Sequence, residues 1–518
     1  MQHRNRPEPS SNDVIVGLVG CGVMGRGIAQ IAALAGAQVR LSDSRQGAAE
    51  AACAELLATF GKLVDKGKLD AGAAAAAGER LHACGGLQDM ASCHVVVEAI
   101  VEDLDAKKSL FKTLEGIVDA GAILATNTSS LSVTAIAAGL AHPERVAGFH
   151  FFNPVPLMKI VEAIGGFLTD PAVVDYLLAL GRHWGHTAVR AKDTPGFIVN
   201  HAGRGYGTEG LRLLAEGVAS VPALDNILRD TAGFRLGPCE LLDLTGLDVS
   251  HPVMESIYHQ YYEEPRFRPQ VQTRQMLVAG ALGKKVGHGF YRYGADGRKE
   301  AIAEPAQPTS QPASVWLSQE RPELAERLAS LIAAAGVAME SGARPSDSAL
   351  CIVTPLGEDA TTCCVREQLD ARRTVAVETL LDLSRRRVVM TTPATTEEFL
   401  TQACGLFGAA GAPAAGIPVS VIRDSAGLVT QRVVAHIVNI ACEIAQQGIA
   451  DPLDIDRAVT LGLGYPLGPL AWGDQLGAKT VFTILKNLEQ QTGDSRYRPS
   501  PWLQRRALLG LSLHHKEI

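Results

Sequence analysis

The sequence predicts two α/β segments, each followed by a helical domain, as the fold of this 518-residue chain. Three observations support this prediction. A glycine-rich turn between a short apolar strand and a helix opens the first α/β segment. A helical pattern begins near residue 195, and its motifs return later at a constant spacing, called here the repeat offset, which takes Lys192 to Arg423. A chain of this length is too long for one hydrophobic core and is expected to form about three or four domains.

Composition narrows the classes of function. The net charge of −7 argues against nucleic acid or an anionic membrane surface as the main partner. No apolar run approaches the ~18 residues that span a bilayer. The ten cysteines include no CxxC motif and no metal-ligand pattern, and only Cys363–Cys364 are adjacent, which fits buried thiols of a cytoplasmic protein. Residues 1–13 are polar, lack the apolar core of a signal sequence and predict a disordered tail.

The first α/β segment begins with a dinucleotide-binding fingerprint in its required context. The strand, glycine turn, helix and second strand fall in order at Val14–Val19, Gly20-Cys21-Gly22-Val23-Met24-Gly25, Arg26–Leu34 and Ala37–Ser42. The glycines allow close approach to a pyrophosphate, and the helix N-terminus offers free N–H groups. Asp43 follows the second strand, where a carboxylate accepts hydrogen bonds from ribose hydroxyls and repels a 2′-phosphate. The sequence therefore predicts a Rossmann domain over residues 14–194 that binds NAD rather than NADP.

Two further buried strands are expected in this domain. Cys93–Ile100 precedes a helix that carries Lys107, and Ala122–Thr126 precedes the run Asn127-Thr128-Ser129-Ser130. Hydroxyl and amide groups at the carboxyl end of a strand lie where open α/β sheets bind ligands. The same residues can also cap a helix that starts at Ser132. Both roles can hold together.

An Ala-rich, mainly helical stretch from Gly47 to Leu81 carries three clustered lysines, Lys62, Lys66 and Lys68. One interpretation is a solvated helical face. The other is a basic rim for a phosphorylated ligand such as coenzyme A.

The stretch Arg145–Ile164 predicts a β-hairpin with a proline-rich turn. If residues near 156 form the turn, His150 and Glu162 face each other and leave the same face of the sheet. A histidine held by a carboxylate is a common base near neutral pH. A core histidine beside a rim glutamate is the alternative, but the facing acid and the cofactor loop favour catalysis.

The helical domain is expected twice. It follows the break at Lys192–Gly196, spans residues 195–293, and has Asn200 in its first turn. Residues 294–315 are rich in Pro, Ala, Gln and Ser and predict a linker. The repeat offset lays Leu467-Gly468-Pro469 over Leu236-Gly237-Pro238, so a second copy is expected over 426–518. Between them, 316–425 predicts a degenerate α/β segment with strands near Ala349–Pro355, Thr374–Thr379, Arg387–Thr391 and Pro418–Ile422.

The second copy is expected to lack the chemistry. A spacing slightly shorter than the repeat offset places Thr379 at the position of His150 and Thr391 at that of Glu162. With the repeat offset itself, Gln431 corresponds to Asn200. No second GxGxxG motif occurs. The sequence thus predicts one active site and a structural second half, whose helical domain packs on the first within the chain.

The chain resembles the 3-hydroxyacyl-CoA dehydrogenases of fatty-acid β-oxidation. The matching motifs are GLVGCGVMGRGIAQ, VVVEAIVEDLDAKKSLF, TNTSSLS, GFHFFNPVPLMKIVE, DTPGFIVN and LGKKVGHGFY, in order over Val14 to Tyr291. The length and the repeated carboxyl domain look most like the 3-hydroxyadipyl-CoA dehydrogenases of aerobic phenylacetate catabolism. The resemblance implies a Rossmann domain followed by an all-α dehydrogenase domain that mediates dimerisation, so homodimers are expected.

The resemblance also implies the site and the reaction. NAD would oxidise a (3S)-3-hydroxyacyl-CoA thioester reversibly to the 3-oxoacyl-CoA. His150 would be the base and Glu162 its orienting partner, while Ser129 and Asn200 would hydrogen-bond the reacting oxygens. Cofactor contacts are then expected at Gly20, Gly22, Val23, Met24, Gly25, Asp43, Glu102, Lys107, Asn127 and Lys285.

The kind of acyl chain that the enzyme accepts is predicted from Arg204, which lies one helical turn after Asn200. Simple members of the family generally carry an apolar residue at the position of Arg204. The hypothesis is that Arg204 binds the distal carboxylate of an adipyl chain; the alternative is a surface or domain-interface salt bridge. Gly203, Gly205, Gly207 and Gly210 crowd the same helix, which indicates a flexible or a close-packed segment.

Three other functions compete with this prediction. One is a 3-hydroxybutyryl-CoA or general β-oxidation dehydrogenase. Another is a Rossmann dehydrogenase that acts on a sugar acid. A more remote one is a catalytically idle NAD-binding structural protein, which intact His150, Glu162, Ser129 and Asn200 argue against.

Overall fold

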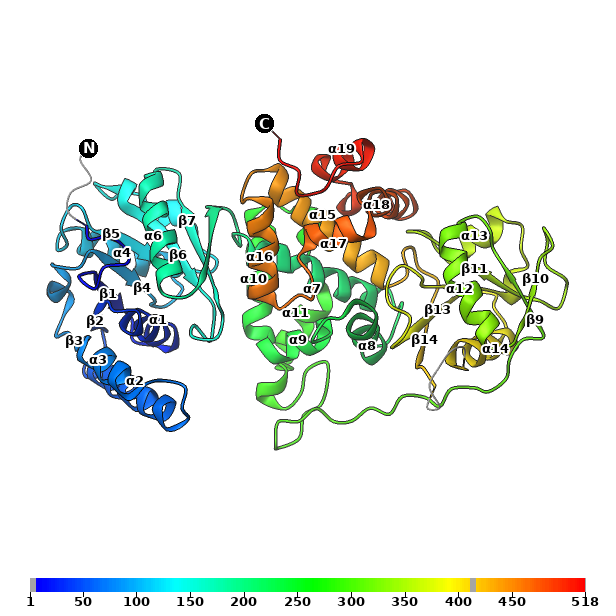
Figure 1. Cartoon of the computed structure of the whole chain (residues 1–518), viewed down its shortest axis with the longest axis horizontal. Coiled ribbons are helices and arrows are strands. Elements are labelled where there is room, and N and C mark those ends of the chain that lie inside the picture. Colours follow the sequence, from blue (N-terminus) through cyan, green and yellow to red (C-terminus); the bar gives the residue numbers. More distant parts are fainter. Residues whose placement is uncertain (1–5, 410–415, 518) are drawn as a thin grey trace. The chain divides into compact units, whose positions relative to one another are not determined.

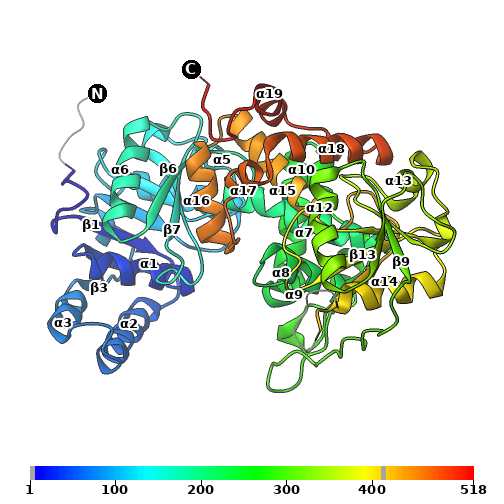
Figure 2. The same ribbon diagram turned by 45° about the vertical axis from the view of Figure 1, so that its right-hand side comes forward.

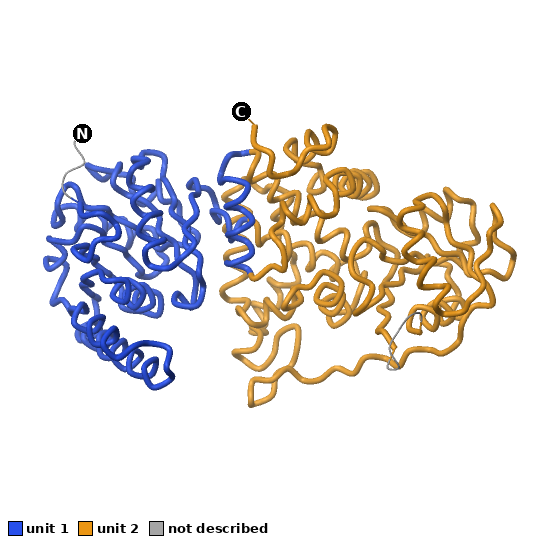
Figure 3. The backbone as a smooth tube through the Cα atoms, in the orientation of Figure 1, with its two compact units in different colours: residues 1–201, 447–463 blue, residues 202–446, 464–518 orange. Residues whose placement is uncertain are grey.

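The structure is a computed structural model that describes residues 6–409 and 416–517 (Figure 1). The chain divides into two compact units, which are described separately. Unit 1 comprises residues 1–201 and 447–463, and unit 2 comprises residues 202–446 and 464–518 (Figure 3). Among the described residues, no helix is long and apolar enough to cross a membrane.

Unit 1 contains an eight-stranded sheet in the order β3-β2-β1-β4-β5-β6-β7-β8. Its strands are β1 (Ile15–Val19), β2 (Gln38–Ser42), β3 (Leu81–Ala83), β4 (Val95–Glu98), β5 (Ile123–Thr126), β6 (Val146–Phe151), β7 (Ile160–Gly165) and β8 (Thr187–Lys192). Every neighbouring pair is parallel except β6 and β7. That antiparallel pair sets His150 opposite Glu162, which confirms the predicted hairpin register.

Helices cover both faces of this sheet. They are α1 (Val23–Leu34), α2 (Ala48–Asp65), α3 (Ala71–Glu79), α4 (Leu104–Glu115), α5 (Val133–Ala137), α6 (Pro171–His183) and α16 (Pro452–Leu463), with 3₁₀ turns η1 (Leu87–Met90) and η2 (Pro143–Arg145). Apolar residues of α1, α2 and α6 share one core with the strand residues of one face. The other face holds α5, because Gly148 leaves room for Val133 beside Ile164. The Rossmann-type fold predicted for this part of the chain is confirmed.

The start of the chain corrects one prediction. Residues 1–5 lie outside the described part, but residues 6–13, also predicted to be disordered, are held against α6. Tyr176 donates a hydrogen bond to the Pro7 carbonyl at 3.0 Å, and the Arg6 guanidinium lies 5.1 Å from the centre of the same ring. A cation over a tyrosine and a buried phenol donor supply contacts that a polar composition does not reveal.

Two groups of helices in unit 2 form two copies of one domain. The first copy contains α7 (Val199–Ala215), which begins in unit 1, α8 (Val221–Ala232), α9 (Pro238–Thr245), η3 (Pro265–Phe267), α10 (Leu247–Gln260), α11 (Val271–Val278) and η4 (Lys284–Val286). The second contains α15 (Thr430–Gln446), α17 (Pro469–Leu476), α18 (Ala478–Thr492), η6 (Ser495–Tyr497) and α19 (Pro501–Leu509), in addition to α16 in unit 1.

The two helical copies pack on each other within the chain, as predicted. Arg266 in η3 donates to the Arg498 carbonyl at 3.0 Å, and Arg496 in η6 donates to the Arg266 carbonyl at 3.4 Å. Two glycines of α7 lie in close packing: a Cβ on Gly205 would lie 3.0 Å from Ile440 of the second copy, and one on Gly210 would lie 2.6 Å from Pro238 of the first, whereas one on Gly207 would meet nothing within 4 Å. Of the two interpretations of this glycine-rich helix, the structure supports the close-packed one.

Unit 2 also contains a six-stranded sheet in the order β10-β9-β11-β12-β13-β14. Its elements are β9 (Ser314–Leu317), α12 (Pro322–Ala334), β10 (Ala338–Glu340), β11 (Leu350–Val353), α13 (Ala360–Arg366), η5 (Ala371–Arg373), β12 (Thr374–Val377), β13 (Arg387–Thr391), α14 (Glu397–Ala409) and β14 (Val419–Ile422). Helices α12 and α14 share one core on this sheet (Figures 1 and 2). The four predicted strands are confirmed, but β9 and β10 were not predicted, and β9 begins inside the stretch taken as a linker.

The second sheet is a shortened copy of the first. The N-cap of α13, Asp359, follows Val353 at the end of β11 by the same spacing that separates Thr126, at the end of β5, from the N-cap Ser132. Asp424 caps α13 in the same way that Asp193 caps α5. Strand β11 therefore corresponds to β5, and in the described residues the second sheet has no counterpart of β3 or β4.

This correspondence corrects the predicted equivalents of the catalytic pair. The turn η5 precedes β12 as η2 precedes β6, so Ala371 corresponds to Pro143. Counting on from these two residues, Glu378, not Thr379, stands at the position of His150. The antiparallel register brings Val388, not Thr391, opposite Glu378, whose amide donates to the Val388 carbonyl at 3.1 Å. The repeat offset holds for the helical copies but slips within the sheet, because the connections there differ in length.

Candidate active site

The glycine loop of unit 1 has the shape needed to hold a pyrophosphate. Gly20 has φ of 100°, and a Cβ there would lie 2.5 Å from the Ala99 carbonyl oxygen. A Cβ on Gly25 would lie 1.8 Å from the Gly20 carbonyl oxygen. A Cβ on Gly22, by contrast, would meet nothing within 4 Å, and no side chain caps the α1 N-terminus there. The loop thus presents unpaired helix amides to open space, which suits a phosphate group.

A cavity of about 650 Å³ adjoins this loop and contains Asp43. The Asp43 carboxylate accepts hydrogen bonds from the Cys21 amide at 2.8 Å and from the Arg45 amide at 3.0 Å. Burial alone would raise the pKa of Asp43, but hydrogen bonds from Arg45 and Cys21 outweigh it and lower the pKa to about 2. Asp43 is therefore ionised and can accept from ribose hydroxyls, so the residues present fit NAD. The sequence did not single out Arg45.

An ion-pair network with a buried lysine lies at the carboxyl ends of β4 and β5. The Lys107 side chain is 1% exposed, and its ammonium lies 2.8 Å from Glu98 and 3.3 Å from Glu102. Glu102 also accepts from the Thr128 hydroxyl at 2.7 Å and from the Ser129 amide at 2.9 Å. Burial would raise the pKa of Glu102, but Lys107 and these hydrogen bonds lower it.

This network shows what surrounds Lys107. The lysine is closed to solvent and contacts two carboxylates, so it holds Glu102 in place, and its predicted contact with the cofactor stays a prediction. Glu98, which is fully buried, was missed by sequence reasoning. An acid that ends an apolar strand was the available signal, because a buried carboxylate requires a partner.

The centre of the site is the ion pair that the hairpin predicted. His150 Nδ1 lies 2.7 Å from Glu162 Oε2, and both side chains are buried. Glu162 Oε1 accepts hydrogen bonds from the amides of Ile198 at 2.9 Å and Val199 at 3.0 Å. Because Nδ1 donates to the carboxylate, Nε2 is the ring nitrogen that remains to accept a proton.

The two amides that hold Glu162 come from an unusual turn before α7. Gly196 has φ of 79° and Phe197 has φ of 50°, both in the left-handed region. The Phe197 ring packs 5.7 Å from that of His150, measured between ring centres. Sequence reasoning missed this anchor. The sequence DTPGF signals a turn, but it does not reveal that the amides after it meet an acid of the hairpin.

Next to this pair, polar side chains form hydrogen bonds with the segment that follows β5 and with the end of β6. The Asn200 side-chain amide donates to the Ser129 carbonyl at 3.3 Å. Asn127 Oδ1 accepts from the Phe151 amide at 2.8 Å, beside His150. The structure therefore brings Asn127, Ser129, His150, Glu162 and Asn200 together in unit 1. Ser132 caps α5 as expected, so capping and a site at the same strand end coexist.

Of the remaining predicted residues, three lie at the end of α2 in unit 1 and two belong to unit 2. Lys62, Lys66 and Lys68 are exposed at the end of α2 and in the turn that follows it. Lys285 and Arg204 belong to unit 2, where Lys285 pairs with Asp248. The Arg204 side chain is half-buried, and burial lowers its pKa, which the nearby Tyr465 offsets only in part.

Comparison with known proteins identifies the family. The model of the 3-hydroxyacyl-CoA dehydrogenase NAD binding domain matches residues 15–194. The model of the 3-hydroxyacyl-CoA dehydrogenase C-terminal domain matches twice, over residues 196–293 and 427–514. The chain belongs to the 3-hydroxyacyl-CoA dehydrogenase family. The double match also confirms that the helical domain is repeated.

Relatives of this dehydrogenase differ in the acyl chain that their names specify. The chain is 37% identical to a 3-hydroxyadipyl-CoA dehydrogenase of Escherichia coli K12 over 95% of its length and 97% of the relative's. It is 39% identical to a probable 3-hydroxybutyryl-CoA dehydrogenase of Deinococcus radiodurans over 54% of this chain and 99% of the relative. A crystal structure of a 3-hydroxybutyryl-CoA dehydrogenase from Escherichia coli K12 has a TM-score of 0.84 at 35% identity, and the alignment covers 96% of this chain and 99% of that one.

Proposed function

We propose that this NAD-dependent 3-hydroxyacyl-CoA dehydrogenase oxidises 3-hydroxyadipyl-CoA to 3-oxoadipyl-CoA, with His150 as the general base. The observation that supports the base is the 2.7 Å contact from His150 Nδ1 to Glu162 Oε2. A carboxylate already fixed by two amides cannot turn away, so it holds one tautomer of the ring.

The proposed chemistry requires a proton acceptor at the 3-hydroxyl. Bound NAD supplies the hydride acceptor. His150 Nε2 takes the hydroxyl proton as the C–H bond breaks, and Glu162 stabilises the imidazolium that forms. In the reverse direction the imidazolium returns the proton to the 3-oxo oxygen.

Ser129 and Asn200 are proposed to bind the substrate oxygens. Both are polar residues at the edge of the His150 pair, and the Asn200 side chain contacts the Ser129 backbone. A hydroxyl and an amide N–H placed there can donate to the 3-oxygen and to the thioester carbonyl, which orients the C3 hydrogen. The two residues thus act by positioning the substrate rather than by taking its proton.

Arg204 is proposed to bind the distal carboxylate of the adipyl chain. A relative that matches nearly the whole chain is named for an adipyl substrate. Arg204 follows Asn200 by one turn of α7, and burial lowers the pKa of its guanidinium. A partly desolvated cation is stabilised by an anionic partner, and a guanidinium fork matches a carboxylate.

A substrate panel tests this assignment. The ratio of kcat/KM for 3-hydroxyadipyl-CoA to that for 3-hydroxyhexanoyl-CoA should exceed one in the wild type. In Arg204→Leu it should fall at least tenfold, the equivalent of about 1.4 kcal/mol, while Arg204→Lys should lose less. An unchanged ratio in Arg204→Leu contradicts the proposal. A wild-type preference for 3-hydroxybutyryl-CoA would favour the short-chain function instead, which the name of the structural relative supports.

The exposed lysines are proposed to bind the phosphates of coenzyme A. Lys62, Lys66 and Lys68 form a cationic edge that no ion pair neutralises among the described residues. Replacing all three with Gln should raise KM for the thioester and weaken its dependence on salt, with KM for NAD unchanged. An unaltered KM would identify the lysines as an ordinary solvated face.

Whole chains are proposed to form homodimers. The two helical copies already pair within one chain, so such a dimer would contain four helical domains. Sedimentation equilibrium should give twice the 54.7 kDa of one chain. A mass of 54.7 kDa would show that the internal pairing replaces dimerisation.

A further inference from the structure

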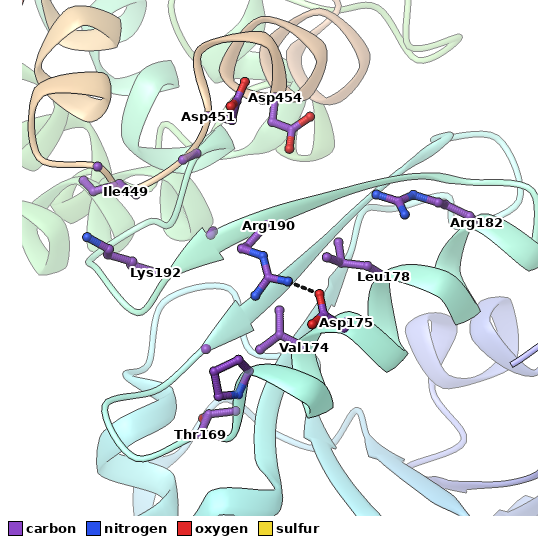
Figure 4. A pocket seen from close by; sticks show the side chains of 15 residues that line it. Thr169, Val174, Asp175, Leu178, Arg182, Arg190, Lys192, Ile449, Asp451 and Asp454 are labelled. Carbon is purple, nitrogen blue, oxygen red and sulfur yellow. Dashed lines mark hydrogen bonds and ion pairs between the residues drawn. The ribbon is translucent and has the colours of Figure 1, made fainter. Parts of the chain in front are cut away.

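A helix from the second, inactive half of the chain packs on the catalytic sheet. The segment 447–463, which includes α16, belongs to unit 1 although the chain before and after it belongs to unit 2 (Figure 3). It lies against β7 and β8 (Figures 1 and 2). The Lys192 amide at the end of β8 donates to the Ile449 carbonyl at 2.9 Å. Figure 4 shows Ile449, Asp451 and Asp454 across a cavity of about 660 Å³ from Arg190.

In unit 2, conversely, a helix of the first half of the chain packs on the second sheet. The Arg423 amide at the end of β14 donates to the Val218 carbonyl at 3.0 Å, and α8 contacts β13. The repeat offset converts Lys192 into Arg423, and it also relates Val218 to Ile449. Each sheet is therefore contacted by a helix that belongs to the other half of the chain.

The last turn of α16 leads directly to the acid of the catalytic pair. A Cβ on Gly462 would lie 2.9 Å from both methyl groups of Val199, so the helix and this side chain are in close contact. The Val199 amide donates to Glu162 at 3.0 Å, and Glu162 holds His150 at 2.7 Å. Gly462 thus supports the backbone that fixes the carboxylate.

We propose that the segment 447–463 is a positioning element of the catalytic site and that Gly462 is the positioning residue through which it acts. The inference rests on the proposed roles of His150 and Glu162. It gives the second half of the chain, which has lost its own chemistry, a function in the reaction of the first. A glycine is required because any side chain at residue 462 displaces Val199, and with it the amide that Glu162 accepts.

The pseudo-equivalent contact in unit 2 supplies a matched control. The repeat offset relates Thr231 to Gly462 and Val199 to Thr430, and the two threonines are joined by a hydrogen bond of 2.9 Å. The position equivalent to Glu162 in that sheet is Val388, which carries no acid. Changing Thr231 therefore disturbs the same kind of helix contact without reaching the catalytic pair.

The experiment compares full-length Gly462→Ala, the double variant Gly462→Ala/Val199→Ala, and Thr231→Val. A displacement of a few tenths of an ångström should lower kcat of Gly462→Ala about tenfold, with KM for NADH within about twofold of the wild type. The kinetic isotope effect with NADH deuterated at the transferred hydrogen should rise, because the chemical step becomes slower. The double variant should recover most of kcat, since Val199→Ala restores the space. Thr231→Val should lower Tm but leave kcat unchanged.

The outcomes separate this inference from the proposed function. Wild-type kcat and isotope effect in Gly462→Ala would overturn the inference, as would a double variant that recovers nothing. If Gly462→Ala is insoluble, Val199→Ile crowds the same gap from the other side and replaces it in the comparison. Glu162→Gln is the reference: a normal kcat there refutes the proposed function, whereas an impaired Glu162→Gln with a normal Gly462→Ala refutes the inference alone.

Discussion

The two sheets of this chain share one hairpin register but carry opposite chemistry. In the first, His150 is paired with Glu162, and both face the strand ends where polar groups gather. In the second, Glu378 stands at the position of His150 and is fully buried. It accepts hydrogen bonds from the Leu380 amide at 2.8 Å and from Gln431 at 3.1 Å. The two sheets therefore keep the same antiparallel pairing, but the second has no histidine facing a glutamate at these positions.

In the second sheet, α18 also packs against the turn that follows β11. A Cβ on Gly357 would lie 2.5 Å from the Ile484 carbonyl oxygen, so α18 lies directly on this turn. The Asn487 side chain donates to the carbonyl of Leu356, which stands where the first copy has Ser129. Gln431, the counterpart of Asn200, donates to the Pro355 carbonyl and accepts from the Gly357 amide. In the second copy, the side chain that corresponds to Asn200 is therefore engaged by backbone groups of Pro355 and Gly357.

This difference shows what a site requires beyond its hairpin. The described residues of the second sheet contain no counterpart of β4, and therefore none of the Glu98–Lys107–Glu102 network. They also contain no glycine loop. Burial raises the pKa of Glu378, which favours the neutral carboxyl, whereas a histidine held by a carboxylate can accept a proton.

The largest effect should come from the base. His150→Ala removes the proton acceptor and should lower kcat by at least ~10², since general-base catalysis is commonly worth 10²–10⁴. NAD binding should remain nearly intact, because the glycine loop and Asp43 are untouched. Glu378→Gln, at the equivalent position of the second sheet, should leave kcat unchanged. Near-normal turnover of His150→Ala, measured as NADH absorbance, would remove the hairpin from the mechanism.

The glycine loop should give a smaller, cofactor-specific effect. At Gly22, which has an ordinary φ of −68°, a side chain would project into open space. Gly22→Val should therefore raise KM for NAD at least tenfold, a loss of about 1.4 kcal/mol, while Tm stays near the wild-type value.

The contrasting variant in the same loop is Gly25→Val. Its Cβ would lie 1.8 Å from the Gly20 carbonyl oxygen, so the loop itself must shift and Tm should fall. Thermal unfolding and NAD titration of both variants measure the two effects. If Gly22→Val loses stability as much as Gly25→Val, the loop does not present open space to a ligand.

Much of the first sheet and its site could be predicted from the sequence, because local patterns determine them. The strand–glycine–helix–strand order fixes the cofactor loop, and alternation about a proline turn fixes the partner of His150. The anchor of Glu162 could not be predicted, since it depends on amides of Ile198 and Val199 that reach it only after folding. Nor could the burial of Lys107, because its partner Glu98 lies on a different element.

The second sheet was predicted less completely for a related reason. Strand β10 is a short, exposed strand at the edge of the sheet, where few residues need to be apolar. Strand β9 lies between β10 and β11 and is buried, but its short sequence SVWL lies at the end of a Pro-rich stretch. The equivalents of the catalytic pair were wrong because a spacing taken from the helical copies does not hold in the sheet. A slip of one residue exchanges the two faces of a strand, so Thr379 was assigned a position that Glu378 occupies.

The smallest expected effect concerns Glu378, the buried acid of the second sheet, and is measured as a change in thermal stability with pH. Burial raises the pKa of Glu378, and hydrogen bonds from Leu380 and Gln431 offset this only in part. The unfolded chain releases this proton near pH 4.3, whereas the folded chain keeps it to higher pH. Between these two pKa values the folded state binds more protons, so wild-type stability falls as pH rises, by at most about 1.4 kcal/mol per pH unit.

Glu378→Gln removes this titration and keeps an acceptor for the Gln431 side chain. The Tm of this variant relative to the wild type should therefore be near zero or negative at pH 4, where most of the wild-type carboxyl is neutral in both states, and should increase towards pH 8. Thermal unfolding of both proteins across this range measures the difference, and the unchanged kcat of the variant shows that the catalytic half is intact. A Tm difference that is flat with pH would mean that Glu378 is ionised in the folded protein. The second sheet would then hold a buried charge. Glu378 would differ from the His150–Glu162 pair in the groups that contact it, and not in being neutral.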